Sequence, residues 1–267
     1  MKLVKHIAIA AFLIVLPGIS GVKNGQDIKM KQQEVLPFKV GEEVTYRVHY
    51  GLVNAGVATV AVKETSRVDG RLVYHMVGKG HTTGVTDWFF PTKDRYETFM
   101  DAETLLPLKF IRDVDEGGYI IKRNIKFDHE QNSAVDYELK KDTTFSLPDN
   151  VQDIFSAFFF ARTFDVSNIQ PGDIIDIPVF LDHEIFPFKI KFVKREEIDT
   201  KFGEIACLKF VPIVQEGRVF KEEDDMHLWI SDDINHIPIR IKSEILVGSI
   251  KVDLKDYKGL VEPLKFK

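Results

Sequence analysis

Apolar and polar residues alternate one by one along most of the chain. From Val44 to Tyr50, every second residue is apolar and the residues between are polar or charged. A period of two is typical of β-strands with one buried and one solvated face. Similar segments recur at intervals of about eight to twelve residues, separated by turn-forming residues such as Asn54-Ala55-Gly56 and Asp69-Gly70. The pattern predicts about a dozen antiparallel strands in two runs, residues 37–146 and 173–260.

One segment has a helical period instead. In "VQDIFSAFFFAR" (residues 151–162), apolar residues recur at spacings of three and four, and further Phe and Ala residues widen the apolar arc. Asp149 stands three residues before Gln152, which resembles a capping box. We predict one buried amphipathic helix near residues 150–163 that joins the two runs of strands. In an alternative interpretation, its Phe face lines a cavity for an apolar ligand.

Together, these elements predict an all-β, mainly antiparallel protein with a strongly curved sheet or a barrel-like architecture. Residues 37–267 are long for one domain, but an all-β unit of this size is feasible. We therefore expect a single β-rich domain, with the helix as its link between the two runs.

The N-terminus has the three parts of a secretory signal peptide. Lys2 and Lys5 precede an apolar run at residues 7–16, and Pro17-Gly18 ends the run. Such a run spans only about 15 Å as a helix, about half of a bilayer's hydrocarbon core. We predict a cleaved signal peptide at residues 1–20, a flexible segment at 21–36, and an exported mature chain without a transmembrane segment. The periplasm is the expected location, with full secretion as the alternative.

Composition narrows the function classes. The chain has 36 basic and 41 acidic residues, and this acidic balance argues against a nucleic-acid partner. Cys207 is the single cysteine, so an intramolecular disulfide is impossible, and its alternating surroundings predict a core position. The motifs of nucleotide-binding loops, zinc proteases and serine hydrolases are absent. We predict no cofactor, no metal and no identifiable catalytic residue.

The stretch "HLWISDDINHIPIRIKSE" (residues 227–244) is the most site-like in the sequence. Alternating apolar residues flank Asp232, Asp233, Asn235 and His236, which indicates two strands joined by a wet turn. The acidic residues and the histidine could instead gather a hard cation. However, Asp and Asn favour turns because their side chains bind the nearby backbone, so we interpret the stretch as a structural hairpin.

Aromatic residues form the candidate binding site. Trp88, Phe89 and Phe90 are consecutive, so in a strand they would point to alternating faces, and Pro91 favours a loop at the rim of a cavity. Ordinary core packing is the alternative. With the helix, these residues would form the wall or lip of an apolar site, for which we predict Trp88, Phe89, Phe90, Phe155, Phe158 and Phe159.

Four stretches resemble a known family. "PFKVGEEVTYRVHYGLVNAGVATVAV", "VQDIFSAFFFAR", "PGD" at 171–173 and "LWISDDINHIPIRI" are similar to the domain of unknown function 3108, an uncharacterised group of exported bacterial proteins. The resemblance covers roughly residues 37–260 and implies a β-rich, curved-sheet fold in the cell envelope, without established catalytic residues. The Trp-x-x-Asp hairpin followed by Pro and Arg is more loosely similar to strands of periplasmic lipoprotein carriers, an analogy of fold alone.

Three function hypotheses follow. We expect a non-enzymatic envelope protein that binds an apolar ligand, such as a lipid or acyl group, or an envelope partner protein. The alternatives are a secreted hydrolase acting on cell-wall or carbohydrate material, and a purely structural module. The lining of the main pocket distinguishes them, because a hydrolase needs facing polar side chains and a lipid site needs apolar ones.

Overall fold

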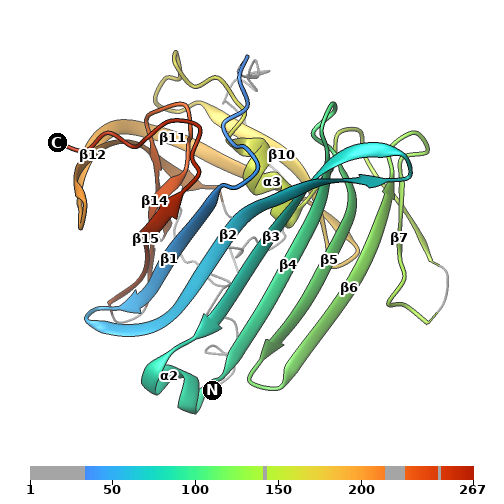
Figure 1. The fold of residues 1–267 in the computed structure, drawn as a ribbon, viewed down its shortest axis with the longest axis horizontal. Helices are drawn as coiled ribbons and strands as arrows, with labels where there is room; N and C mark the ends of the chain where they lie inside the picture. Colours follow the sequence, from blue (N-terminus) through green and yellow to red (C-terminus); the bar gives the residue numbers. More distant parts are fainter. Residues whose placement is uncertain (1–33, 141–142, 214–225, 246–247) are drawn as a thin grey trace.

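A computed structural model describes residues 34–140, 143–213, 226–245 and 248–267. The predicted signal peptide and most of the predicted flexible segment lie outside these residues. The described residues form fifteen strands and two helices (Figure 1). The strands are β1 (Glu43–Tyr50), β2 (Val53–Val68), β3 (Arg71–Thr82), β4 (Thr92–Asp101), β5 (Pro107–Glu116), β6 (Tyr119–Asp128), β7 (Ser133–Asp136), β8 (Thr144–Ser146), β9 (Gln152–Asp153), β10 (Ile174–Leu181), β11 (Glu184–Thr200), β12 (Gly203–Pro212), β13 (Met226–Ser231), β14 (Pro238–Glu244) and β15 (Ser249–Lys258). The helices are α2 (Gly84–Phe89) and α3 (Ile154–Ala161).

All of these strands belong to one sheet. Its order is β8-β7-β6-β5-β4-β3-β2-β1-β15-β14-β13-β12-β11-β10-β9, so neighbours in the chain pair as hairpins. The first and last strands, β1 and β15, pair with each other in the middle and join the two predicted runs. Every pairing is antiparallel except the short one between β9 and β10. The predicted all-β, mainly antiparallel fold class is confirmed, with fifteen strands where about a dozen were expected.

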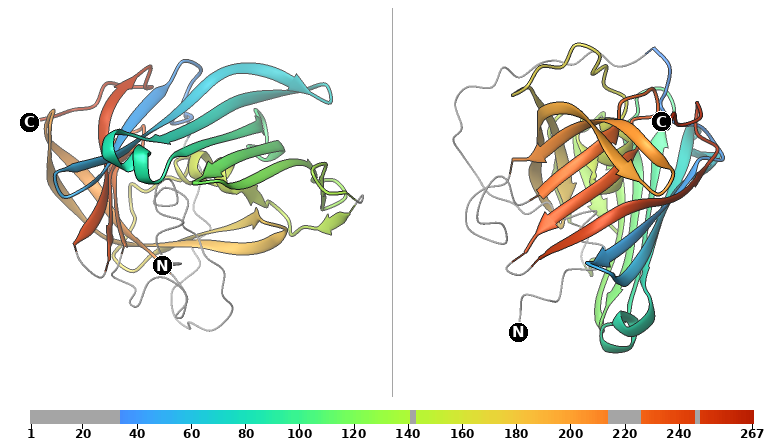
Figure 2. Two further views of the ribbon diagram at one scale, coloured as in Figure 1. Left: turned by 90° about the horizontal axis from the view of Figure 1, so that it is seen from below. Right: turned by 90° about the vertical axis from the view of Figure 1, so that its left-hand side faces the viewer.

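Curvature brings the two runs toward each other (Figure 2). The turn between β10 and β11 reaches back to the first run through side chains. Arg112 on β5 donates from Nη1 to the Asp182 carboxylate at 3.2 Å, and His183 hydrogen-bonds Asp136 at 2.8 Å. These contacts link the two runs of a strongly curved, barrel-like sheet, as predicted.

Helix α3 fills the hollow between the runs. Phe155 and Phe159 are buried in the core. The Phe155 ring lies against Gly78 of β3, where an added Cβ would come within 2.8 Å of the ring. A bare backbone at this position therefore lets the helix approach the sheet. The predicted buried helix is confirmed.

The capping box of α3 lies four residues later than predicted. The cap is Asp153, whose carboxylate accepts the backbone N–H groups of Phe155 and Ser156, both at 2.7 Å. Ser156 accepts the Asp153 N–H in return, at 2.9 Å. The expected pair, Asp149 and Gln152, does not cap the helix, because Gln152 and Asp153 extend as β9 beside β10 before the helix begins.

Two local predictions were also wrong. The turn expected at residues 54–56 lies earlier, because Gly51 adopts a positive φ of 54° and β2 already begins at Val53. The loop expected at residues 87–90 is largely a helical turn, α2, held to the end of β3 by a hydrogen bond from Thr82 to Asp87 at 2.8 Å. Among the described residues, no helix is long and apolar enough to span a membrane.

Candidate functional site

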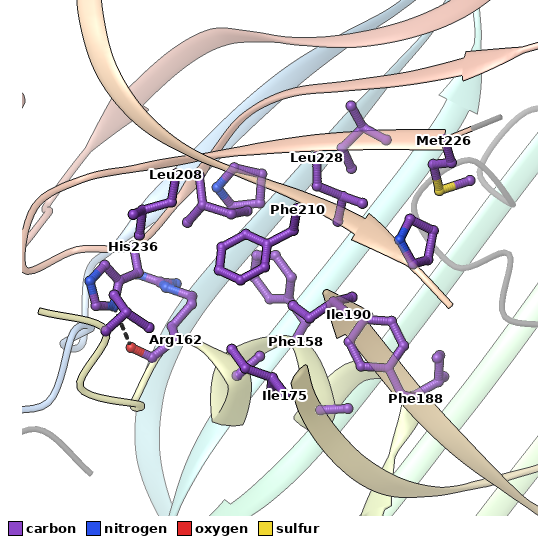
Figure 3. Close-up of a pocket in the computed structure, with 18 residues that line it drawn as sticks. Phe158, Arg162, Ile175, Phe188, Ile190, Leu208, Phe210, Met226, Leu228 and His236 are labelled. Atoms are coloured by element: carbon purple, nitrogen blue, oxygen red, sulfur yellow. Dashed lines mark hydrogen bonds between the residues drawn. The ribbon is translucent and has the colours of Figure 1, made fainter. Parts of the chain in front are cut away.

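A pocket lies between α3 and the inner face of strands β10 to β14 (Figure 3). Its volume is about 110 Å³. On this measure, a volume of about 10–15 Å³ holds one water molecule, so the pocket accommodates a chain of several heavy atoms. Its lining is Ile154, Ala157, Phe158, Ala161, Arg162, Val166, Ile175, Phe188, Ile190, Leu208, Phe210, Pro212, Met226, Leu228, Ile230, His236, Pro238 and Ile241.

The lining is apolar apart from two residues. Of the 18 lining residues, only Arg162 and His236 have polar side chains, and both lie at the same end of the pocket (Figure 3). The strand residues come from alternate positions, such as Leu208 and Phe210 on β12, because a strand presents every second side chain to one face. An apolar wall of this kind favours hydrocarbon over water.

Arg162 closes one end of the pocket, but its guanidinium is engaged within the protein. It forms a bidentate ion pair with Glu42, at 2.6 and 3.0 Å, and only 4% and 1% of the two residues' surfaces are exposed. Nε donates to the carbonyl oxygen of Asn235 at 2.9 Å, and Nη2 donates to that of Pro37 at 2.8 Å. With so many donors directed at protein acceptors, Arg162 acts as a structural cross-link.

The second polar residue, His236, is also bound internally. Its Nδ1 lies 2.9 Å from the carbonyl oxygen of Arg162, so Nδ1 carries the proton and donates it. Burial lowers the pKa of His236 below its usual range, which keeps the imidazole neutral at pH 7.

The turn that precedes His236 explains the site-like stretch of sequence. Asp233 accepts hydrogen bonds from the Ser231 hydroxyl at 2.7 Å and from the Asn235 N–H at 2.9 Å. Asp232 pairs with Arg195 at 3.0 Å. The carboxylates and the histidine therefore point to different partners, and the stretch has the contacts of a structural turn, as interpreted from the sequence. The prediction of a wet turn was wrong for Asn235 and His236, which are buried.

The opposite end of the pocket has no such polar group. Met226 and Phe188 lie there, away from Arg162 and His236 (Figure 3). Met226 begins β13 and pairs with Ser243, which in turn pairs with Ile250 near the start of β15. This end therefore points to the same edge of the sheet as the turns β1–β2 and β14–β15.

The structure places the six predicted site residues at four positions. Phe158 lines the pocket, whereas Phe155 and Phe159 on the same helix face the core. Trp88 and Phe89 lie on α2, away from the pocket, with 85% and 77% of their surfaces exposed. Phe90 packs its ring against Gly117. The two aromatic groups of the prediction thus do not form one site.

Sequence reasoning missed most of the pocket wall. Leu208, Phe210, Leu228, Ile230 and Ile241 all belong to strands that the alternation predicts. The alternation indicates which residues share a face, but it does not show which face the helix leaves partly uncovered. One feature of the sequence could have indicated the pocket. The second run of strands carries large apolar side chains, and the predicted helix is apolar over most of its circumference.

A second group of polar side chains lies on the inner face of β4 and β5, outside the pocket lining. Asp94 and Glu116 are buried there, with Arg112 beside them. Burial, and then the negative charge of Glu116, raises the pKa of Asp94 to about 7. Neither carboxylate is among the lining residues of the apolar pocket.

Cys207 occupies the core position expected from the sequence. It is buried, and burial raises the pKa of its thiol to about 12. A thiol with so high a pKa is almost wholly protonated at pH 7 and is a poor nucleophile.

Comparison with protein families identifies the group to which the chain is related. The model described as "Protein of unknown function (DUF3108)" matches residues 45–255. The chain belongs to the DUF3108 family. This confirms the resemblance found in the sequence. No curated protein matches the chain.

One solved structure supports the fold of this DUF3108 protein. A β-barrel-like protein of the domain of unknown function DUF1849 from Brucella abortus matches with a TM-score of 0.55 and 12% identity, over 83% of this chain and 98% of that chain. A DUF1089 family protein from Pseudomonas aeruginosa matches with a TM-score of 0.37 and 13% identity, over 81% and 97%. At these identities the first match bears on the fold alone.

Proposed function

We propose that this protein is exported to the cell envelope and binds an apolar ligand there, such as the acyl chain of a lipid, in the pocket beside α3. The observation that carries the proposal is the lining: sixteen apolar residues, with Arg162 and His236 as the two exceptions. Export rests on the predicted signal peptide at residues 1–20.

The two polar lining residues favour a hydrocarbon chain over a polar ligand. Arg162 and His236 direct their hydrogen bonds to Glu42, Asn235, Pro37 and each other. A ligand group that took over these bonds would leave a buried charge unpaired, which is costly. Burial of apolar surface contributes about 25 cal/mol per Å², so affinity for a hydrocarbon would come mainly from the wall.

The first test is the identity of any bound compound. Native mass spectrometry of the purified full chain, followed by solvent extraction, should detect a co-purifying acyl compound. A clean apo mass, together with an unchanged melting temperature across a panel of fatty acids and phospholipids, would overturn the proposal.

The second test fills the pocket. Ala161 lines it and is half-buried, so Ala161→Leu adds bulk to the cavity. We expect about a tenfold or greater loss of affinity for a fluorescent polyene fatty acid, because the added methyl groups occupy the ligand's space. Ala206→Leu adds the same atoms at an exposed position of β12 and is the matched control. Equal binding by the two variants would contradict the proposal.

A further inference from the structure

Exposed apolar side chains gather at one end of the sheet. They belong to the turn between β1 and β2, to α2, to the turn between β5 and β6, and to the turn between β14 and β15, which Figure 1 shows along its lower edge. Leu52 is the most exposed, at 96%. We call this set the aromatic rim: Tyr50, Leu52, Val53, Val85, Trp88, Phe89, Tyr119, Ile120 and Ile245.

The turns of the aromatic rim are held side by side. The Tyr50 ring lies against Gly248, which joins the turn β14–β15 to the turn β1–β2. The Thr83 N–H, just before α2, donates to the carbonyl oxygen of Ala55 on β2 at 3.0 Å. The Gly117 N–H donates to the carbonyl oxygen of Pro91 at 2.8 Å. The exposed side chains therefore project from one continuous edge of the molecule.

The charges near the rim are of both signs. Asp87 accepts a hydrogen bond from Thr82 at 2.8 Å, and Asp115 accepts one from the Gly118 N–H at 2.9 Å. Lys79 and Lys93 lie just behind α2 on β3 and β4, are exposed, and form no ion pair within the described parts of the chain. Both acids keep their negative charge, because a hydroxyl group and an N–H group donate these bonds, and Asp115 lies opposite Lys93 in the β4–β5 register. Affinity of the rim for a surface would therefore come from its apolar side chains.

We infer that the aromatic rim docks onto the surface of a lipid bilayer. Trp and Tyr side chains prefer the interface between headgroups and hydrocarbon, and apolar tips insert about 5–10 Å into that region. A row of apolar tips on separate turns suits a deformable lipid surface, whereas a protein partner requires a complementary shape.

Docking also explains the direction of the pocket. The end of the pocket marked by Met226 and Phe188 points to the edge of the sheet that carries the aromatic rim. A protein seated by this rim would hold the apolar end of its pocket toward the bilayer and the Arg162 end away from it. This link between rim and pocket rests on the proposed function, but docking itself does not.

Vesicle flotation of the purified full chain tests the inference. We expect binding to vesicles of phosphatidylglycerol and phosphatidylethanolamine that persists at high salt and with phosphatidylcholine in place of the anionic lipid, because apolar side chains carry it. The double variant Trp88→Ser/Phe89→Ser should lose about tenfold or more in partitioning, because both exposed anchors are removed. Leu72→Ser removes an exposed apolar residue at the opposite end of β3 and should bind as the wild type does.

Tryptophan fluorescence reports the orientation. The chain has two tryptophans, of which Trp88 is exposed and Trp229 is buried. Lipids brominated in their acyl chains should quench part of the wild-type emission on binding. Trp88→Phe should still float but should lose that quenching, because only the buried Trp229 remains.

The outcomes separate docking from ligand binding. Docking is overturned if the wild type does not float, if the double variant floats equally well, or if light scattering shows that the rim residues instead hold two copies of the chain together. Ala161→Leu should float as the wild type does. Failure of the wild type to bind a fatty acid would overturn the proposed function and leave flotation intact.

Discussion

Two regions of the molecule depart in opposite ways from the usual pattern of buried apolar and exposed charged side chains: the surroundings of α3 and the aromatic rim. Around α3, the charged residues Glu42, Asp153 and Arg162 are buried. At the rim, Leu52 and Trp88 are almost wholly exposed. Polar groups in the interior are tolerated when every one is bonded, whereas large apolar groups on the surface often mark a binding face. The contrast indicates that the α3 network maintains the fold and that the rim is available for binding.

The α3 network joins segments that are far apart in the chain. Arg162 binds Glu42, 120 residues earlier, and Asn235, 73 residues later. Its guanidinium also lies over the rings of Phe38, Phe158 and Phe159, at 5.5 to 5.8 Å. One side chain therefore ties the segment before β1 and the β13–β14 turn to the helix that fills the hollow.

The largest expected effect comes from breaking this cross-link. Glu42→Gln removes the buried negative charge and leaves Arg162 without its ionic partner, so we expect the free energy of unfolding to fall by about 3–5 kcal/mol. The neighbouring Glu43 pairs with Lys63 and Lys258 at the surface, at 3.1 and 3.0 Å. Glu43→Gln should cost less than about 1 kcal/mol.

Urea denaturation of both variants at pH 7 measures the difference. Because the two glutamates are adjacent and the substitution is the same, the difference between the variants reports the effect of burial on the ion pair. Similar losses in the two variants would show that the buried ion pair does not hold this end of the molecule.

The second effect is a dependence on pH. Burial raises the pKa of Asp153 to about 6, although three hydrogen bonds to its carboxylate, from the Thr98 hydroxyl and the N–H groups of Phe155 and Ser156, oppose this. Between about pH 4 and 6 the folded protein retains a proton that the unfolded chain releases, so stability from this group falls as pH rises through that window. Asp153→Asn lacks this titration. Relative to wild type, its free energy of unfolding should therefore rise by about 1–3 kcal/mol between pH 4 and pH 7.

Urea denaturation at four pH values checks this prediction. The difference between the two proteins should change between pH 4 and 6 and stay constant above pH 7. A difference that is independent of pH would mean that the carboxylate is ionised throughout, held in that form by its hydrogen bonds.

Alternation of residues was sufficient to predict the fold class. The strands after Val44 follow a period of two, and α3 follows a helical period, so both appear in the local pattern. The cap of α3 did not, because β9 forms only by pairing with β10, about 27 residues later in the chain. The six-residue α2 also escaped prediction, since so short a segment shows no helical period.

The site was less accessible to sequence reasoning, for two physical reasons. Arg162 and Glu42 meet only because β1 pairs with β15 and closes the sheet around α3, and no local pattern shows this. The sequence also did not show which aromatic side chains are exposed to solvent. Trp88 and Phe155 both looked like candidate walls of one site, yet one is in solvent and the other is in the core.

The smallest expected effect is at the aromatic rim. Leu52→Ser and Trp88→Ser each remove a side chain that is more than four-fifths exposed, so the free energy of unfolding should change by less than about 0.5 kcal/mol. Phe155→Leu, in the core, is the contrasting variant and should cost about 1–3 kcal/mol. Thermal and urea denaturation measure both. A loss above about 1 kcal/mol at the rim would show that its apolar residues support the fold. In that case a role in the fold would explain the exposed apolar residues of the rim. Neither the contrast with α3 nor lipid docking would then be needed.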